Sequence, residues 1–259
     1  MIEAAISMDK VSFAYDKTVV LKNITLSVPR NRICFIMGNN GSGKTTLLKN
    51  IMGFLLPQSG RILIADKDVS EIDRSAMSKL ISYVPQAIHL NTDFSVIDYL
   101  SLGRTPHIGV LNRLRQSDYE IIERYAHRFG IDTIFDATFN KLSGGQKQIV
   151  AITRSLIQDT PLIIMDEPMS ALDIGKQVEI IQLLRELAES RTIVLTTHNP
   201  NHALAIDSDA CFMEYGEIIA YGNSQQIIRN GLLKKIYGDN IALDQGTIAN
   251  SVVFDVKTK

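Results

Sequence analysis

The strongest candidate for a chemical site in this sequence is a glycine-rich stretch that ends in a lysine and two threonines. It satisfies the phosphate-binding pattern G-x-x-x-x-G-K-[ST] at every fixed position. Its members are Gly38, Asn39, Asn40, Gly41, Ser42, Gly43, Lys44, Thr45 and Thr46. Glycines let the backbone turn tightly so that several N–H groups face one point, and a following helix adds the unpaired donors of its first turn. We therefore expect a polyphosphate site, with Lys44 at the β- and γ-phosphates and Thr45 as a ligand of Mg²⁺.

Two adjacent carboxylates follow an apolar run farther along the chain. Residues 162–165 are Leu-Ile-Ile-Met, and Asp166 and Glu167 come directly after them. Downstream of a phosphate-binding loop, such a pair predicts Asp166 in the Mg²⁺ shell and Glu167 as the group that polarises water. The alternative is a pair of acids on a solvated strand end.

Two single polar residues also follow apolar runs. Gln86 comes shortly after residues 81–84 and could contact Mg²⁺ or the attacking water, whereas alone it would be a turn residue. His198 comes shortly after residues 192–196, and a lone histidine after a strand is usually structural. Because ligands of open α/β sheets bind at the carboxyl ends of the strands, we expect both residues at the sheet edge that holds Gly38 and Glu167.

A second glycine-rich stretch, Leu-Ser-Gly-Gly-Gln at residues 142–146, precedes a helical pattern. Ser143 is a good N-cap residue. Gly144 and Gly145 are poor helix formers, each costing roughly 1 kcal/mol relative to alanine. They make sense if the backbone must approach a phosphate closely, so this stretch predicts a second phosphate contact.

The elements that must position these residues follow an α/β pattern. Residues 33–37 are an unbroken apolar run, which predicts a buried parallel strand before Gly38, and residues 46–52 have helical spacing. A hairpin of strands at residues 11–15 and 19–28 comes first, and its Tyr15 could stack on a base or be a half-buried strand aromatic. Residues 94–158 are mostly helical, with a loop at 105–109, and a hairpin at 210–221 and short strand patterns after residue 236 complete the chain.

Composition sets further limits. The 259 residues are 45% hydrophobic and 21% charged with a net charge of −1, so no basic field for nucleic acid is evident. Cys34 and Cys211 lie in apolar runs and are expected in the core, which suits a reducing compartment. His89, His107 and His127 lack metal-ligand spacing. No run approaches the roughly 20 apolar residues that a membrane span needs.

Taken together, these segments resemble the nucleotide-binding subunit of ATP-binding cassette transporters. The resemblance runs from Tyr15 to about Gly222 and is carried, in order, by GNNGSGKTT, Gln86, LSGGQKQ, LIIMDEP, SALD and His198. It implies an α/β P-loop NTPase core with an antiparallel β subdomain and an inserted helical subdomain at about residues 88–156. The ATPase domain would cover residues 1–232, with a short tail at 233–259. Asn39 and Met169 depart from the family, where proline and threonine are common.

The resemblance also implies a head-to-tail homodimer that sandwiches two ATP molecules with Mg²⁺. In it, residues 143–146 of one subunit face the γ-phosphate held by the other subunit's P-loop. The other roles are carried over position by position. Tyr15 would stack on adenine, and Gln86 would couple the site to a permease. Glu167 would be the catalytic base, Asp173 would communicate across the dimer, and His198 would contact the γ-phosphate.

Within this family, residues 101–107, SLGRTPH, resemble the LGRxPH segment of importers for ferric siderophores, haem, vitamin B12 and related metal chelates. This implies a peripheral ATPase on the cytoplasmic face of the membrane. Its partners would be permease subunits and, indirectly, a periplasmic or extracellular binding protein, and not nucleic acid. Arg104 and His107 are expected in a loop that either supports permease docking or merely joins two helices. The alternatives to the importer are an iron–sulfur cluster assembly ATPase and an exporter ATPase.

Overall fold

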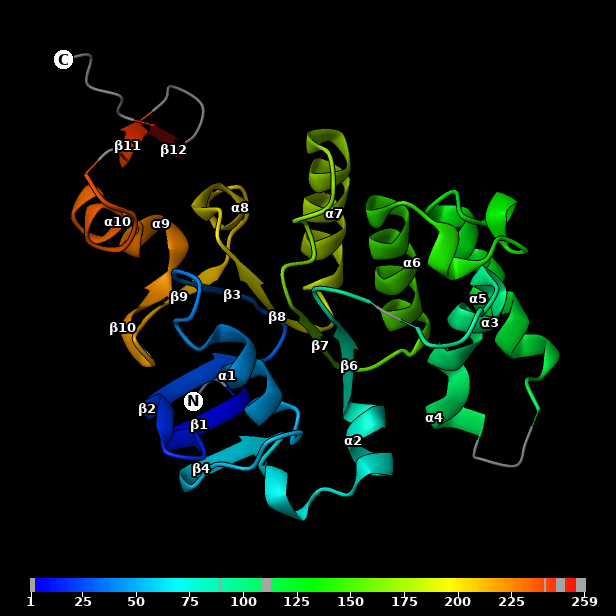
Figure 1. Cartoon of the computed structure of the whole chain (residues 1–259), viewed down its shortest axis with the longest axis horizontal. Coiled ribbons are helices and arrows are strands. Elements are labelled where there is room, and N and C mark those ends of the chain that lie inside the picture. Colours follow the sequence, from blue (N-terminus) through cyan, green and yellow to red (C-terminus); the bar gives the residue numbers. More distant parts are fainter. Residues whose placement is uncertain (1–2, 89, 109–112, 240, 246–249, 255–259) are drawn as a thin grey trace. The chain divides into compact units, whose positions relative to one another are not determined.

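The computed structural model describes residues 3–88, 90–108, 113–239, 241–245 and 250–254 (Figure 1). His89 and residue 246, part of the strand pattern expected around residues 244–246, lie outside these ranges. The chain divides into two compact units, which we call the first unit (Met1–Ile72 with Ile181–Lys259) and the second unit (Asp73–Ile180). The boundary falls within helix α7 (Ile174–Leu187).

An antiparallel sheet opens the first unit. Its strands, in the order β2-β1-β4-β5, are β1 (Ala4–Tyr15), β2 (Thr18–Pro29), β4 (Ser59–Ile64) and β5 (Lys67–Asp68). Along β2, buried apolar side chains are interspersed with exposed polar ones. Leu21 and Val28 are among the fully buried side chains. The predicted hairpin is confirmed, and β1 begins earlier than expected because Ile6 and Met8 continue its alternation.

A second group of strands in the first unit carries the glycine-rich loop. They lie in the order β10-β9-β3-β8, where β3 (Ile33–Met37) is parallel to both β8 (Thr192–Thr197) and β9 (Asp209–Glu214), and β10 (Glu217–Asn223) is antiparallel to β9. Every residue of β3 is buried, as its apolar run predicts. The helices of this unit are α1 (Lys44–Ile51), α8 (Pro200–Leu204), α9 (Ser224–Ile227) and α10 (Asn230–Tyr237).

The chain's last described elements agree with the expectation of short strands around residues 244–246. The strands β11 (Ile241–Gln245) and β12 (Asn250–Phe254) form an antiparallel pair, and α10 ends just before them at Tyr237. Leu233 and Ile236 are buried apolar side chains of α10. Apolar residues three apart on one helical face explain why this segment is a helix.

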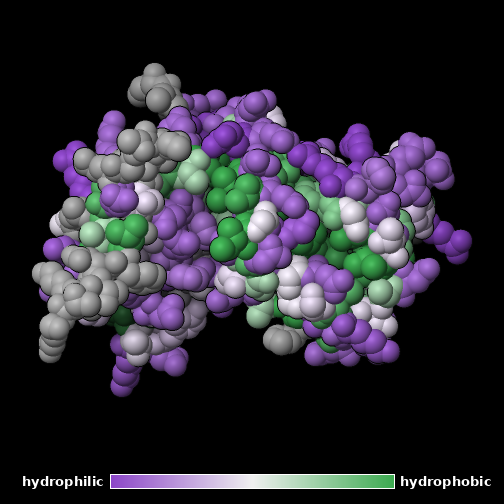
Figure 2. Space-filling model, turned by 90° about the horizontal axis from the view of Figure 1, so that it is seen from above, coloured by the Kyte–Doolittle hydropathy of each residue, from purple (hydrophilic) through white to green (hydrophobic). Residues whose placement is uncertain are grey.

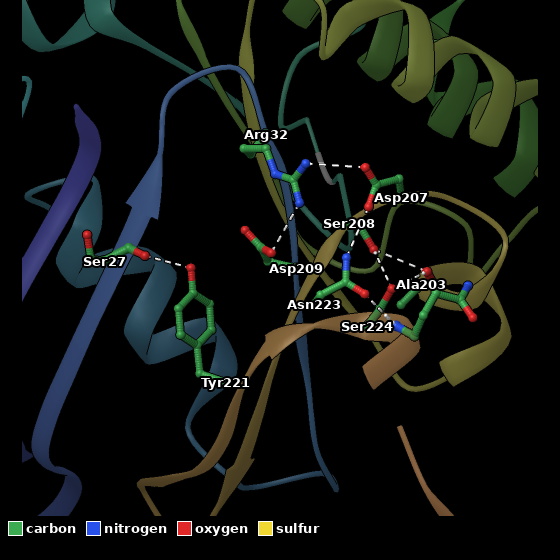
Figure 3. A network of polar contacts seen from close by, with 10 residues as sticks. Ser27, Arg32, Ala203, Asp207, Ser208, Asp209, Tyr221, Asn223 and Ser224 are labelled. Carbon is green, nitrogen blue, oxygen red and sulfur yellow. Dashed lines mark hydrogen bonds and ion pairs between the residues drawn. The ribbon is translucent and has the colours of Figure 1, made fainter. Parts of the chain in front are cut away.

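A polar network joins the start of β3 to α8, β9 and β10 (Figure 3). Arg32 binds Asp207 at 3.3 Å and Asp209 at 3.4 Å. Ser208 and Ser224 both donate to the carbonyl of Ala203, at 3.1 and 3.0 Å. These bonds satisfy the Ala203 carbonyl in α8. They thereby hold this short helix, which comes shortly after the predicted site residue His198, in place.

The second unit contains a parallel pair of strands, β6 (Ile81–Val84) and β7 (Leu162–Met165), and most of the helices. These helices are α2 (Arg74–Leu80), α3 (Val96–Ser101), α4 (Thr105–Ile108), α5 (Gln116–Arg128) and α6 (Gly144–Ile157). On α5, Ile122 and Ala126 are fully buried, as the predicted amphipathic pattern requires. The loop expected at residues 105–109 is wrong for its described part, since residues 105–108 form α4.

The face seen in Figure 2 is mainly polar, with apolar groups interspersed. Within the described ranges, the most exposed large apolar side chains are Ile174 at 80%, Tyr215 at 79% and Phe54 at 66%. None of the described helices has both the length and the apolar character required to cross a membrane. Cys34 and Cys211 are both buried as free thiols, as expected, and burial raises the pKa of each.

Candidate active site

The glycine-rich loop connects β3 to α1 and folds back on its own lysine. Lys44 is the first residue of α1 and only 8% exposed. Its Nζ donates to the carbonyls of Gly38 at 2.8 Å and Asn39 at 3.1 Å. The cation is therefore held at the mouth of the loop, among backbone groups.

The loop is shaped for close approach of a ligand to its backbone. Gly43 has φ 102° and caps α1 without any side-chain hydrogen bond, so the first N–H groups of this helix receive no side-chain cap. A Cβ on Gly38, which has φ 147°, would lie 2.2 Å from the Met213 carbonyl oxygen. Ser42 Oγ is buried with no hydrogen-bond partner within the described ranges. An uncapped helix start, an unsatisfied hydroxyl and a buried ammonium fit a polyphosphate.

The other loop residues take different environments. Asn39, Asn40 and Gly41 are exposed, Thr45 is half-buried, and Thr46 is buried with its carbonyl accepting a bond from Asn50. Thr45 follows the lysine at the helix start, as a hydroxyl ligand of a phosphate-bound cation requires. Tyr15 is 43% exposed at the end of β1, and its ring meets Phe13 edge to face with centroids 4.9 Å apart. Its outer face is free of the core, so it can stack on a base.

The two carboxylates end β7 in the second unit. Asp166 is 2% exposed and Glu167 is 7% exposed. The Asp166 N–H donates to the Val84 carbonyl at 2.8 Å, which ties the end of β7 to the end of β6. Gln86 follows β6 and is exposed, so these three residues share one strand edge. Burial, and then the negative charge of Asp166, raise the pKa of Tyr83 to about 12.

Glu167 has a strained backbone. Its φ is 49°, in the left-handed region that a glutamate rarely occupies. The turn is held by Ser170, whose N–H and Oγ both donate to the Glu167 carbonyl, at 3.2 and 2.9 Å. Such strain costs of order 1–3 kcal/mol and concentrates at functional sites.

His198 lies at the same strand edge as the glycine-rich loop. Met37 pairs with Thr197 across the parallel strands, so Gly38 and His198 both continue from paired strand ends in the first unit. His198 is exposed, and the next residue, Asn199, caps α8 by accepting from the Asn201 N–H at 3.0 Å. The shared edge predicted for these two residues is therefore confirmed.

A second histidine, His202, supports this segment and was missed in the sequence. It is 7% exposed, and its Nδ1 lies 2.9 Å from Thr197 Oγ1, which also accepts from the Asn199 N–H. Burial first, and then the nearby charge of His198, lower the pKa of His202 to about 4. It is therefore a neutral hydrogen-bonding brace at pH 7. The only signal in the sequence is its spacing of five residues from Thr197.

The second glycine-rich stretch begins α6 and is turned toward solvent. Ser143 accepts from the Gln146 N–H at 3.2 Å, and Gln146 Oε1 accepts from the Ser143 N–H at 3.0 Å, which is a complete capping box. Ser143, Gly144 and Gln146 are exposed. A pocket of about 410 Å³ beside them is also lined by Asp173.

Gly144 is not required by close packing of its own unit, whereas Gly145 lies closely against the turn before α7. A Cβ on Gly144 would meet only the Ala171 Cβ, at 3.8 Å, and one on Gly145 would lie 3.2 Å from the Ala171 carbonyl oxygen. Asp173 caps α7, accepting from the Lys176 N–H at 2.9 Å, and is exposed. This surface is open to a ligand or partner from outside the unit.

The segment at residues 101–107 is a structural brace. Arg104 donates to Asp118 Oδ1 at 2.8 Å and to the Ile157 carbonyl at 3.1 Å, and both side chains of the ion pair are nearly buried. His107 Nε2 lies 2.7 Å from the Gln158 carbonyl oxygen. A Cβ on Gly103 would lie 2.7 Å from the Arg154 carbonyl oxygen. The placement of Arg104 and His107 in a loop is therefore wrong, because residues 102–104 form a 3-10 turn and residues 105–108 form α4. The segment braces the end of α6, and its support of permease docking stays a prediction.

Metal-ligating side chains do not cluster. The described residues contain no group of three or more histidine, cysteine, aspartate or glutamate side chains that could hold a metal ion. His107 and His127 bind the Gln158 carbonyl and Asp132, respectively. This fits Mg²⁺, which is usually held by one or two protein oxygens together with phosphates, and Thr45 and Asp166 supply oxygens of the right kind.

Comparison with known proteins places the chain in a family. The pattern of the family described as ABC transporter matches residues 21–170. The "Probable iron chelatin transport ATP-binding protein" of Helicobacter pylori is 30% identical over 91% of this chain and 96% of its own. The manganese transport system ATP-binding protein of Bacillus subtilis is 33% identical, over 91% and 93%. A solved structure described as a metal-chelate type ABC transporter in an inward-facing conformation matches with a TM-score of 0.82 at 26% identity, over 97% of both chains.

The family match covers more than half of the chain and includes the glycine-rich loop, the stretch at residues 142–146 and both carboxylates. The relatives extend the match over nearly the whole length of the chain. The chain therefore belongs to the ABC transporter family, as one of its ATP-binding ATPase subunits.

Proposed function

We propose that this subunit hydrolyses ATP as a head-to-tail homodimer and thereby drives a membrane importer of a metal chelate. The observation that carries the dimer is the start of α6, an exposed helix N-terminus with a complete capping box and a glycine, Gly144, that its own unit does not need. The chelate is supported by the relatives and by the segment at residues 101–107.

Binding of the nucleotide rests on the first unit. Lys44 lies at the mouth of the glycine-rich loop and is the charge partner of the β- and γ-phosphates, and the uncapped start of α1 supplies backbone donors. Tyr15 stacks on the adenine. Thr45 and Asp166 are the side chains that would hold Mg²⁺, with Gln86 as a further oxygen. The cation would neutralise charge on the phosphates during transfer.

Hydrolysis rests on Glu167 and His198. An ionised Glu167 carboxylate only accepts hydrogen bonds, and Ser170 fixes the turn that carries it. Glu167 therefore orients the attacking water and deprotonates it as general base. His198 contacts the γ-phosphate, and its segment is held in place by His202 and Thr197. Ser143, Gly145 and Gln146 contact the γ-phosphate bound by the partner copy, while Asp173 communicates across the dimer.

Coupling to transport requires a membrane partner. We assign permease docking to the helical insert at about residues 88–140, with Gln86 at its junction with the ATPase core. Leu102 and Tyr119 are large apolar side chains of this insert that are 40% exposed. The subunit would thus work at the cytoplasmic face of the membrane, beside permease subunits and, indirectly, a substrate-binding protein.

A second candidate substrate has its own support. The manganese relative is as similar to this chain as the iron chelatin relative, so transport of an unchelated metal ion is the competing function. Both candidates share the same ATPase chemistry. They differ in the cargo chosen by the permease and the binding protein.

The test is uptake of a radiolabelled ferric siderophore and of radiolabelled Mn²⁺ by cells that carry the wild-type chain or Glu167→Gln. We expect Glu167→Gln to abolish uptake of the iron chelate and leave Mn²⁺ uptake unchanged. Loss of Mn²⁺ uptake alone would assign the second candidate. No effect on either, with no permease co-purifying, would contradict the importer.

Docking has a separate test. Leu102→Glu and Tyr119→Glu place charge on the exposed insert and should lower uptake while the purified subunit keeps its ATPase rate. Glu120→Gln, an exposed neighbour on α5, is the matched control and should leave both unchanged. Normal uptake by both charged variants would place docking elsewhere.

A further inference from the structure

The glycine-rich loop is tied to the far C-terminal helix of the same unit. Asn39 Nδ2 donates to the Ile236 carbonyl oxygen at 2.7 Å, across 197 residues of sequence. Ile236 lies in the last turn of α10, whose final carbonyls have no partner within the helix. The side chain of Asn39 therefore satisfies a helix-end carbonyl that would otherwise need another donor.

Asn39 also holds the lysine of the loop. Its carbonyl accepts from Lys44 Nζ at 3.1 Å and from the Ser42 N–H at 3.1 Å. One residue thus binds the ammonium with its backbone and α10 with its side chain. A shift of α10 would therefore act on Asn39 and, through the Asn39 carbonyl, on the ammonium.

The same end of α10 also faces the segment after β8. A pocket of about 360 Å³ is lined by His198 and Asn199 together with Tyr237 and Ile241. Tyr237 is the next residue after Ile236. The end of α10 is therefore adjacent to two segments of the nucleotide site in the first unit.

Burial of α10 makes it a stiff support. Leu233 is fully buried and Ile236 is 4% exposed, so the helix is anchored by its apolar face. Gly238, with φ 92°, ends it, and its N–H donates to the Lys234 carbonyl at 2.9 Å. The polar contact to Asn39 is at this anchored end.

We propose that Asn39 is a positioning residue that couples α10 to the nucleotide site, so that ATP binding and docking of α10 stabilise each other. The proposal rests on the proposed function, because it needs ATP on the glycine-rich loop. Coupling between two sites is reciprocal, so the factor by which docked α10 raises ATP affinity equals the factor by which ATP stabilises the docking. A hydrogen bond of purely structural value would stabilise α10 equally with and without ATP.

The experiment measures amide hydrogen exchange of the full-length chain with and without Mg²⁺ and a non-hydrolysable ATP analogue. In the wild type we expect the analogue to slow exchange both in the glycine-rich loop and in residues 233–238, the latter about two- to tenfold, the range for one hydrogen bond. In Asn39→Ala the slowing at residues 233–238 should be lost. The dissociation constant of the analogue should rise by the same factor.

Two further variants separate positioning from folding. Lys235→Ala removes an exposed side chain of α10, 3.9 Å from Glu214, and should retain the slowing and the affinity. Asn39→Pro also lacks the side-chain amide, so it should likewise lose the slowing at residues 233–238.

Each outcome has one meaning. Slowing in the loop but not at residues 233–238 of the wild type would overturn the coupling and leave ATP binding intact. Slowing retained in Asn39→Ala, or restored in Asn39→Pro, would show that the Asn39 amide is not the link. No slowing anywhere would instead contradict the proposed function.

Discussion

Two glycine-rich helix starts in this molecule have opposite surroundings. The loop before α1 is closed over its own buried lysine, 8% exposed, and its helix lacks a side-chain cap. The stretch before α6 is exposed, and Ser143 and Gln146 cap each other completely. The first has a buried hydroxyl without a partner and a helix start without a side-chain cap, whereas the second has a complete capping box.

Under the proposed function, this difference corresponds to two different steps. A loop with an unsatisfied buried hydroxyl and a held ammonium would bind phosphate by itself. A capped, solvent-facing helix start adds a contact only when a charged group is brought to it from outside. Damage to the first should therefore remove binding, and damage to the second should remove hydrolysis but not binding.

The largest effect is expected from Lys44→Ala. The variant leaves the phosphates without their main charge partner, so hydrolysis should fall to background and ATP affinity by about a hundredfold, near the upper limit for a charged hydrogen bond. Isothermal titration and phosphate release measure the two quantities. Lys49→Ala, on the half-buried side of the same helix, is the control. Wild-type hydrolysis by Lys44→Ala would mean that the loop does not bind the reacting phosphates.

Glu167→Gln should separate binding from chemistry. The amide keeps the shape of the side chain and removes the base, so hydrolysis should fall about 10²–10⁴-fold while ATP affinity stays unchanged. Because ATP then persists, the variant should dimerise on adding ATP and Mg²⁺, which light scattering detects. A variant that remains monomeric at saturating ATP would count against the head-to-tail dimer.

Gly145→Asp tests the exposed helix start. A carboxylate there repels the partner's γ-phosphate, so hydrolysis should fall at least tenfold while the monomer binds ATP normally. Gly144→Asp is the companion variant, since a Cβ at that position meets only one atom, at 3.8 Å. Thermal unfolding checks that both chains fold. An equal loss of monomer binding would place this stretch at its own chain's nucleotide.

The smallest effect on hydrolysis is expected from Arg104→Ala, which tests the brace at residues 101–107. It leaves the nearly buried Asp118 without its ion pair and should reduce the free energy of unfolding by about 2–3 kcal/mol. The rate per folded molecule should stay near wild type. Arg124→Ala, an exposed arginine of α5, should cost less than about 0.5 kcal/mol. A loss of hydrolysis without a loss of stability would contradict the brace.

The same pair predicts a dependence on pH. Burial raises the pKa of Asp118, but hydrogen bonds from the Arg115 N–H and Arg104 outweigh it and hold this pKa below its usual value. The stabilisation is therefore present above the usual aspartate pKa of about 4 and is lost as pH falls below it. The stability difference between wild type and Arg104→Ala should narrow below that pH in urea unfolding.

Much of the fold could be predicted because local pattern and motif agree. The strand at residues 33–37 matches β3 residue for residue, since an unbroken apolar run ends at a glycine loop. The strand before Asp166 matches β7 for the same reason. The capping box of α6 was only half predicted, because Ser143 is an evident N-cap whereas the return bond from Gln146 depends on its rotamer.

The missed features depend on contacts distant in sequence. His107 binds a carbonyl 51 residues away in the sequence. Because this contact is not visible locally, the segment around its proline was predicted to be a loop. The bond from Asn39 spans 197 residues, and a polar residue in a phosphate loop gives no local sign of it. The role of His202 depends on its burial, and the burial of a polar residue cannot be predicted from a single sequence.

The most direct test of the difference between the two helix starts mixes two inactive chains. Lys44→Ala and Gly145→Asp are combined at equal concentrations with ATP and Mg²⁺. If one copy's glycine-rich loop works with the other copy's α6, each mixed dimer has one complete site. Hydrolysis should then recover to about a quarter of the wild-type rate, because half of the dimers are mixed. A mixture as inactive as its components would contradict the shared site and place both helix starts at a nucleotide bound within one chain.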